Sequence, residues 1–345
     1  MQKITVHAPG SYDRLRIESA ADPMPGPGEV RVRVAHAGVN YADCIVRMGL
    51  YESARRYVGW PITPGFEVAG VVDAVGEPGE AGAVLRPGTA VLAVTRFGGY
   101  ASHVAVPRHQ VFPIPAGWSS AQAAGFPAVA LTAHYALRVL VAPRPGAQLL
   151  VHSAAGGVGS ALCQLGRAAG CRITAVVGGP HKVAAAERAG AHHVIDKSST
   201  ALWPAARAAA PDGYDAVFDA NGVATLRQSY AHLAPTGRLV IYGFHSMLPH
   251  DGRLNWLRLA WDWLRTPRFN PLDMTQSNRS VLAANLSFLQ SEAPRLREGM
   301  RWLMQRFESR ELQPLPVETF PLERAADAQR RIESGQSIGK IALLP

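Results

Sequence analysis

The stretch that decides the fold is QLLVHSAAGGVGSALCQLGRAAG, residues 148–170. It joins a short apolar run, 148–154, to a helix-like segment through a turn that contains Gly156, Gly157 and Gly159. Glycines here let the backbone turn sharply and leave room for a pyrophosphate, while amides at the helix start face the phosphates. Because a strand precedes the glycines and a helix follows them, the motif predicts a dinucleotide-binding βαβ unit. A strand-to-helix turn without a ligand is the alternative.

Apolar runs and helix-like segments alternate after this motif. The runs are apolar on both faces, as expected for strands of a parallel sheet that helices cover on both sides. They lie at 172–178, 192–196, 216–220, 238–244 and 280–289. We therefore predict an α/β fold in which a doubly wound parallel-sheet (Rossmann) domain, residues 122–289, binds the cofactor.

The first third of the chain has a different pattern. Polar and apolar residues alternate in EVRVRVAHAGV at 29–39, FEVAGVVDAVG at 66–76 and RPGTAVLAV at 86–94. This alternation is typical of antiparallel strands with one buried face. Few helical patterns interrupt these runs, so we predict a β-rich, partly barrel-like domain.

The C-terminal tail contains no nucleotide motif of its own. A helix is expected around 293–309, and GKIALLP at 339–345 has the pattern of a closing strand. We assign this tail to the first domain, so that residues 1–121 and 290–345 together form the catalytic domain.

The residues after the second predicted strand distinguish NAD from NADP. An Asp or Glu there would hold the ribose 2′-hydroxyl of NAD and would repel the 2′-phosphate of NADPH. This chain has Gly178 at the strand end, Lys182 in the following turn and no acid until Glu187. Lys197 follows the third predicted strand, so two of the four lysines of an arginine-rich chain lie near this place. We predict NADPH as the cofactor, with ordinary surface lysines as the alternative explanation.

Four segments resemble the quinone oxidoreductase family of medium-chain dehydrogenases/reductases in order and spacing. They are GVNYADCIVRMGLY at 38–51, PGFEVAGVVDAVGE at 64–77, LTAHYAL at 131–137 and VHSAAGGVGSALCQLGRAAG at 151–170. The C-terminal part, with NWLRLAWDWL, QSNRSVLAANLSFL and SIGKIALLP, is most similar to the VAT-1 branch. The resemblance implies a GroES-like fold for the β-rich domain and a homodimer formed through the nucleotide domain.

The resemblance also implies roles for individual residues. Asn40 would lie beside the nicotinamide ribose and the substrate, and Tyr51 would line the substrate pocket; both are candidate catalytic residues. Thr132 would contact the cofactor near its nicotinamide, and Lys182 would meet the 2′-phosphate. The family often has a hydroxyl residue and a tyrosine where this chain has Gly178 and Lys197. The other predicted cofactor-binding residues follow the strands of the nucleotide domain: Ala155, Gly156, Gly157, Val158, Asn221, Gly243, Phe244, Ala284, Asn285 and Leu286.

No zinc is expected at this site. Zinc alcohol dehydrogenases of the same superfamily use a catalytic cysteine in the first of these segments and a histidine in a Gly-His-Glu triplet, because a Lewis acid must hold the alkoxide. Asn40 and Phe66 occupy those positions here. Hydride transfer without a metal needs a small, hydrophobic acceptor that is already electrophilic, such as a quinone or an α,β-unsaturated carbonyl. Asn40 and Tyr51 are the nearest hydrogen-bond donors for its developing charge; a turn asparagine and a loop aromatic are the alternatives.

Composition argues against several other classes of protein. The formal charge of +9 comes mainly from arginines spread along the chain without a basic block, so we expect no nucleic-acid partner. Cys44, Cys163 and Cys171 lack CxxC spacing, which favours a reducing, cytoplasmic location and small buried thiols. The N-terminus has no signal-peptide pattern. His152 is expected to be a packed histidine in a buried strand.

The segment LNWLRLAWDWL at 254–264 places a broad apolar arc on a helix, with a narrow polar stripe of Arg258 and Asp262. We predict that this helix is buried between domains or at a dimer contact, and that it caps the substrate cleft or the subunit interface and makes the pocket apolar. An interfacial membrane helix is the alternative; peripheral membrane contact is not favoured because such helices have a wider polar face.

Three functions are compatible with these features. NADPH-dependent reduction of quinones or similar activated acceptors is the first. An enoyl or enone reductase is the second, because the same site could deliver hydride to Cβ. The third is a VAT-1-like protein that binds NADPH, associates with a membrane or a partner, and catalyses little, since fold alone does not establish activity.

Overall fold

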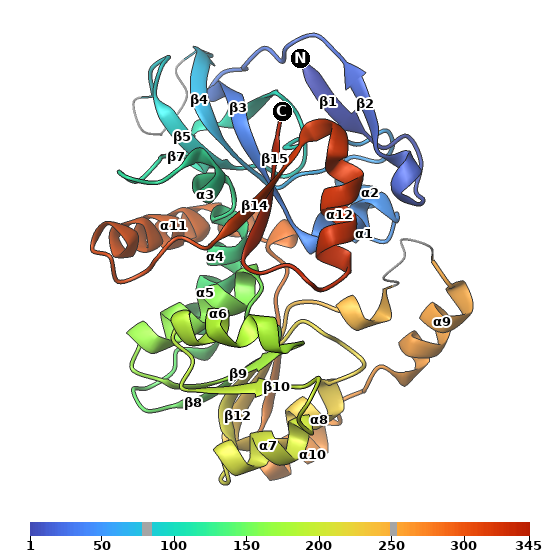
Figure 1. Cartoon of the computed structure of the whole chain (residues 1–345), viewed down its shortest axis with the longest axis vertical. Coiled ribbons are helices and arrows are strands. Elements are labelled where there is room, and N and C mark those ends of the chain that lie inside the picture. Colours follow the sequence, from blue (N-terminus) through green and yellow to red (C-terminus); the bar gives the residue numbers. More distant parts are fainter. Residues whose placement is uncertain (78–84, 249–253) are drawn as a thin grey trace.

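The structure is a computed structural model that describes residues 1–77, 85–248 and 254–345. Two domains lie one above the other, and both chain termini are in the upper one (Figure 1). The lower domain contains the glycine-rich turn, and the upper domain contains the strands of the first third of the chain. The predicted combination of a Rossmann domain and a β-rich GroES-like domain is confirmed.

A parallel sheet forms the centre of the lower domain. Within the described residues its order is β10-β9-β8-β11-β12-β13, so the chain runs outward from β8 in one direction and then from β11 in the other. This reversal creates a crevice at the carboxyl ends of β8 and β11, where open α/β sheets bind ligands. The strands are β8 Gln148–Val151, β9 Arg172–Val177, β10 His193–Asp196, β11 Tyr214–Asp219, β12 Leu233–Ile241 and β13 Ser280–Ala283.

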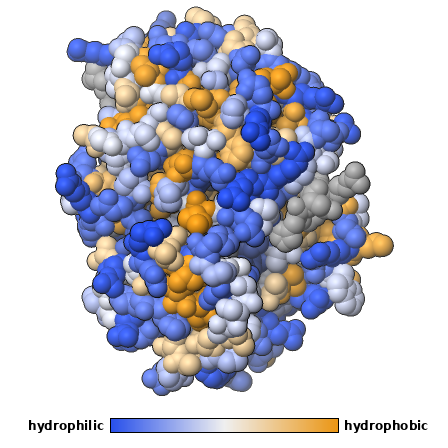
Figure 2. Space-filling view, viewed as in Figure 1, coloured by the Kyte–Doolittle hydropathy of each residue, from blue (hydrophilic) through white to orange (hydrophobic). Residues whose placement is uncertain are grey.

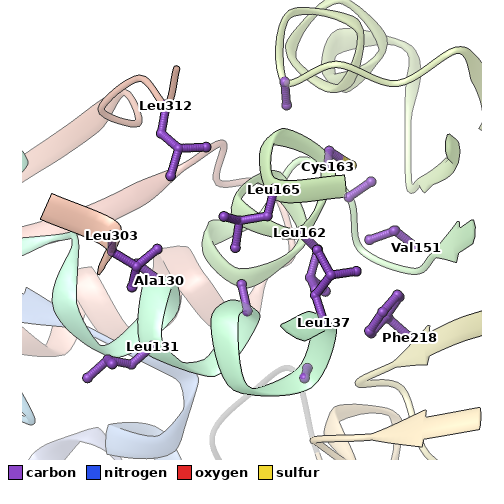
Figure 3. Packing of buried hydrophobic residues seen from close by; sticks show 14 of the residues in the cluster. Ala130, Leu131, Leu137, Val151, Leu162, Cys163, Leu165, Phe218, Leu303 and Leu312 are labelled. Atoms are coloured by element: carbon purple, nitrogen blue, oxygen red, sulfur yellow. The ribbon is translucent and has the colours of Figure 1, made fainter. Parts of the chain in front are cut away.

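Helices cover both faces of this sheet because its strands are apolar on both sides. Leu162 on α5 and Phe218 on β11 are fully buried in one core, which Figure 3 shows from close by. The covering helices are α5 Gly157–Ala168, α6 Val183–Arg188, α7 Leu202–Ala209 and α8 Leu226–Ala231.

The upper domain is built on a second sheet, in which the described strands follow the order β14-β15-β3-β4-β5-β7 and β6 also pairs with β3. The closing strand β15 pairs with β3, so the end of the chain lies beside its first third (Figure 1). The strands are β3 Glu29–Val39, β4 Glu67–Val75, β5 Ala90–Val94, β6 His103–Pro107, β7 Val111–Pro113, β14 Val317–Pro321 and β15 Lys340–Leu344, with β1 Gln2–Thr5 and β2 Arg16–Ser19 as a separate pair.

Helices of the upper domain complete this fold. Tyr41–Arg47 forms α1 and Glu52–Tyr57 forms α2, on the segment that contains Asn40 and Tyr51. Ala325–Glu333 forms α12, which packs against α1 and precedes β15.

The Ala- and Leu-rich segment after residue 119 becomes three short helices at the junction of the domains. These are α3 Ser120–Ala124, α4 Pro127–His134 and a π-helical segment η3, Tyr135–Val141. The break follows from Pro127, which cannot supply a helix-interior amide but suits the first turn of α4. Ala293–Glu308 forms α11, which packs on α4; Leu303 lies near Ala130 in Figure 3.

The sixth strand is shorter than the predicted 280–289. It ends at Ala283, because the Asn285 side chain accepts a hydrogen bond from the amide of Ser287 and starts a 3-10 turn, Leu286–Phe288. This turn carries the end of β13 toward the upper domain.

The prediction that the tryptophan-rich helix is buried between domains is wrong. This helix, α9 (Trp256–Arg265), lies at the edge of the molecule, where Figure 2 shows hydrophobic atoms at the surface. Asp262 is its buried residue, while its exposed apolar side chains are Trp256, Leu257, Trp261, Trp263 and Leu264, each at least 60% exposed. The periodicity of the sequence predicted the apolar arc of α9 but not whether the arc faces the core or solvent. In the structure the arc faces solvent.

Two parts of the α9 region do border the interior. Leu259 lines the cavity described below, and Leu254 packs against the buried side chains of Cys44 and Met48. Leu259 is thus the residue of α9 that borders the cavity, and whether this segment caps the substrate cleft or a subunit interface stays a prediction. The chain continues through α10 (Pro271–Ser277) to β13. Among the described residues no helix combines the length and apolar character needed to cross a bilayer.

Candidate active site

A cavity of about 1220 Å³ lies between the two domains. Residues from both sheets and from the junction helices line it. Every residue that the sequence nominated for catalysis or cofactor binding is among the lining residues: Asn40, Tyr51, Thr132, Ala155, Gly156, Gly157, Val158, Gly178, Lys182, Lys197, Asn221, Gly243, Phe244, Ala284, Asn285 and Leu286.

The glycine-rich turn forms one wall of this cavity. Ser153 has a φ of 53°, which turns the chain sharply out of β8. A Cβ on Gly159 would lie 2.4 Å from the carbonyl oxygen of Ser153, so glycine is required for the close packing of α5. A Cβ on Gly156 would lie 3.3 Å from the same carbonyl oxygen, a tight contact, so glycine also suits the position before the first amides of α5. Those amides lack partners within the helix and suit a pyrophosphate.

Two lysines that follow β9 and β10 also line the cavity. Lys197 lies beside the backbone of Gly178, where a Cβ would be 3.9 Å from its Cε. Lys182 donates a hydrogen bond to the carbonyl of Gly335 in the upper domain. Burial, and then the charges of Arg331 and Lys197, lower the pKa of Lys182. This concentration of positive charge favours an anionic group such as a 2′-phosphate.

Asn40 is held by a buried ion pair. Its Nδ2 donates to Glu67 Oε1 at 2.8 Å, and its Oδ1 accepts from Lys340 Nζ at 2.7 Å. Lys340 and Glu67 are themselves paired at 2.8 Å, with side chains 4% and 0% exposed. Glu67 Oε2 also accepts from the amide of Ala128 at 2.7 Å. Asn40 thus has a fixed orientation, and an amide nitrogen carries two N–H groups, so one remains for a ligand.

Tyr51 connects the two domains at the substrate end. Its hydroxyl lies 2.8 Å from Ser287 Oγ and 3.2 Å from Asn285 Oδ1, both on the turn after β13. Its ring packs edge-on against Phe66. Burial raises the pKa of Tyr51, opposed by the hydrogen bonds from this turn. The hydroxyl is therefore protonated at neutral pH and able to donate a hydrogen bond.

Several other predicted residues present backbone rather than free side chains. Thr132 donates its hydroxyl to the carbonyl of Ala128 at 2.7 Å, within its own helix. Asn221 lies after β11, where its amide donates to the buried carboxylate of Asp219 at 2.8 Å. Ser153 donates to Asn221 Oδ1 at 3.4 Å, which joins the loops after β8 and β11.

The residues interpreted as ordinary core are buried. His152 and Cys44 are both 0% exposed, and His152 lies 3.1 Å from Ser229 Oγ. Across the described ranges, His, Cys, Asp and Glu side chains form no group of three suited to a metal.

Sequence reasoning missed the partners of Asn40. Lys340 and Glu67 are separated by most of the chain, so spacing could not bring them together. A signal was nevertheless present. Each is a charge at the first position of a largely apolar strand, and Lys340 is one of four lysines in the chain.

Comparisons with known proteins agree with this architecture. Residues 189–343 match a family described as zinc-binding dehydrogenase, and residues 26–116 match the alcohol dehydrogenase GroES-like domain. The crystal structure of Escherichia coli quinone oxidoreductase complexed with NADPH superimposes with a TM-score of 0.86, at 26% identity and 100% coverage of both chains.

Curated relatives extend over nearly the whole chain. The synaptic vesicle membrane protein VAT-1 homolog of Rattus norvegicus is 33% identical over 97% of this chain and 82% of its own length. The 2-haloacrylate reductase of a Burkholderia species is 28% identical over 99% of this chain and 98% of its own length. The chain therefore belongs to the medium-chain dehydrogenase/reductase superfamily, in the family of the VAT-1 homologues.

Proposed function

We propose that this chain is an NADPH-dependent, zinc-independent oxidoreductase that reduces quinones or similarly activated carbonyl and alkene acceptors. The observation that carries the proposal is that one cavity joins the glycine-rich turn and its two lysines to Asn40 and Tyr51. The similar quinone oxidoreductase was solved with NADPH, which supports the choice of cofactor. Asn40 stands where zinc enzymes of the superfamily have a cysteine ligand.

Different residues along the cavity would bind the cofactor and the acceptor. The first amides of α5 would hold the pyrophosphate, and Lys182 and Lys197 would hold the 2′-phosphate. Bound NADPH supplies the hydride. Asn40, oriented by Lys340, would offer its remaining N–H to the acceptor. Tyr51 Oη would donate a hydrogen bond to the oxygen that becomes negative, and its protonated state suits that role.

An enoyl or enone reductase is the second candidate. The similarity to a 2-haloacrylate reductase favours it, because that enzyme's name describes an activated alkene as its substrate. A VAT-1-like binding protein with little catalysis is the alternative from a different class.

A turnover panel tests these functions. Oxidation of NADPH would be followed with quinones, enones and enoyl thioesters; we expect quinone or enone turnover. Replacing Tyr51 by Phe should lower kcat by about 100-fold, as for other donors to a developing oxyanion. Tyr230→Phe is the matched control, because the Tyr230 hydroxyl lies 3.4 Å from Ser277 and is not among the residues that line the cavity. Tight NADPH binding without turnover on any acceptor would instead support the binding protein.

A further inference from the structure

A second group of basic side chains lines the cavity from elements other than those that carry Lys182 and Lys197. It consists of Arg96, His109 and Arg297. Arg96 follows β5 and His109 precedes β7, and the antiparallel pairing of these two strands brings their flanking residues together. Arg297 comes from α11, and burial, followed by the charge of Arg297, lowers the pKa of His109.

The charges of the two arginines are not neutralised by the protein. Within the described residues neither arginine forms an ion pair, and Arg96 Nε is buried without a hydrogen-bond partner. The Arg96 guanidinium stacks on the ring of Tyr57, 3.9 Å from its centroid, which fixes its position without cancelling its charge. A buried hydrogen-bond donor without a partner costs free energy unless a ligand accepts its hydrogen bond.

Acidic residues along the cavity do not compensate for these charges. Glu333 is paired with the buried Arg47 at 2.6 Å. Glu52 has a side chain 65% exposed to solvent and lies 3.8 Å from Arg55. This part of the cavity is therefore net positive.

The cofactor does not account for this second group. Its phosphates belong at the glycine-rich turn and at the lysines, whereas Arg96 belongs to the catalytic domain and Arg297 to the junction helix α11. The same cavity also has apolar walls that suit the body of an acceptor, made by Phe66, Phe112, Leu131, Tyr135, Leu286 and Met300.

We propose that the hydride acceptor carries a carboxylate, which Arg96 and Arg297 bind while its apolar body lies against these walls. His109 would contribute a neutral hydrogen bond beside them. This inference rests on the proposed function, because it names the class of acceptor for the same site. Arginine suits the task because its planar fork binds both oxygens of a carboxylate.

The test compares two acceptors that differ by one charge: an aryl enone with a para-carboxylate, and its methyl ester. Calorimetry on the protein loaded with NADP⁺, which cannot reduce them, measures binding separately from turnover. We expect the acid to bind at least about 10-fold more tightly than the ester, and Arg297→Gln or Arg96→Gln to remove most of that preference. Arg301→Gln, an exposed residue on the same helix that is not among the lining residues, should preserve it.

The outcomes separate this inference from the proposed function. Equal binding of acid and ester overturns the carboxylate site, and so does an equal loss of the preference for the acid in Arg297→Gln and Arg301→Gln. Turnover of the ester would in that case still support the proposed reductase. Arginine-dependent binding of the acid without turnover of either compound supports the carboxylate site and contradicts the reductase. Thermal unfolding of each variant checks that its fold is intact.

Discussion

Replacing Lys340 by Met is expected to destabilise the protein and release Asn40. The Lys340 ammonium donates to Val39 O at 2.9 Å, Asn40 Oδ1 at 2.7 Å and Glu67 Oε1 at 2.8 Å. Methionine keeps an unbranched apolar stem, so the packing of Lys340 over Gly157, where a Cβ would be 3.0 Å from Cδ, is largely retained. The substitution therefore tests the charge rather than the volume.

The magnitude follows from the burial of the pair. Glu67 is 0% exposed and would keep hydrogen bonds from Asn40 Nδ2 and the Ala128 amide, but it would lose its cation. Removing one partner of a buried ion pair costs about 3–5 kcal/mol, because the other charge stays desolvated. Freed from Lys340, the Asn40 amide can rotate, so kcat should also fall.

Urea unfolding followed by tryptophan fluorescence measures this loss. The double variant Lys340→Met with Glu67→Gln should recover most of the stability, since it removes the uncompensated carboxylate. Lys3→Met, in the edge strand β1, is the matched control and should change the free energy of unfolding by less than about 0.5 kcal/mol. A loss below about 1 kcal/mol for Lys340→Met, or a further loss in the double variant, would refute the reasoning.

Three further predictions follow from the site and the surface. Lys182→Glu should weaken NADPH binding by about 1–3 kcal/mol and NADH binding far less, because the cation beside the 2′-phosphate is lost. Fluorescence titration measures both affinities, and equal affinities of the parent protein for NADPH and NADH would contradict the assignment of NADPH as the cofactor. Elemental analysis should find no stoichiometric zinc, and chelation should leave activity unchanged, since Asn40 and Phe66 occupy the positions of zinc ligands in zinc alcohol dehydrogenases. One zinc per chain that is lost together with activity would contradict this prediction. We expect a second copy of the chain to cover the exposed apolar arc of α9, so replacing Trp256 and Trp261 by Ser should shift the protein toward monomer in light scattering, because the apolar contact surface is reduced. An unchanged oligomer that no longer binds anionic vesicles would assign this surface to a membrane.

The fold was predictable because its signals are local. A parallel sheet is specified by the glycine-rich turn between β8 and α5 and by the later strands that are apolar on both faces. These signals do not depend on the rest of the chain. Alternation in Glu29–Val39 specifies an antiparallel strand for the same reason. Local signals were weaker at element ends: the strand predicted for 280–289 ends at Ala283, where the side chain of Asn285 starts a turn.

The sequence by itself determined the two domains and the cofactor turn, since periodicity and glycine placement constrain the backbone nearby. The predicted catalytic residues and most of the predicted lining residues came from the resemblance to the quinone oxidoreductase family. Tertiary structure alone decided which distant residues meet. Lys340 reaches Asn40 because β15 pairs with β3, and Arg297 lines the same cavity as His109 because α11 packs on α4 at the domain junction. The same limit explains α9: a period of 3.6 residues defines its apolar arc, but only the docking of neighbouring elements fixes whether that arc faces the core or solvent.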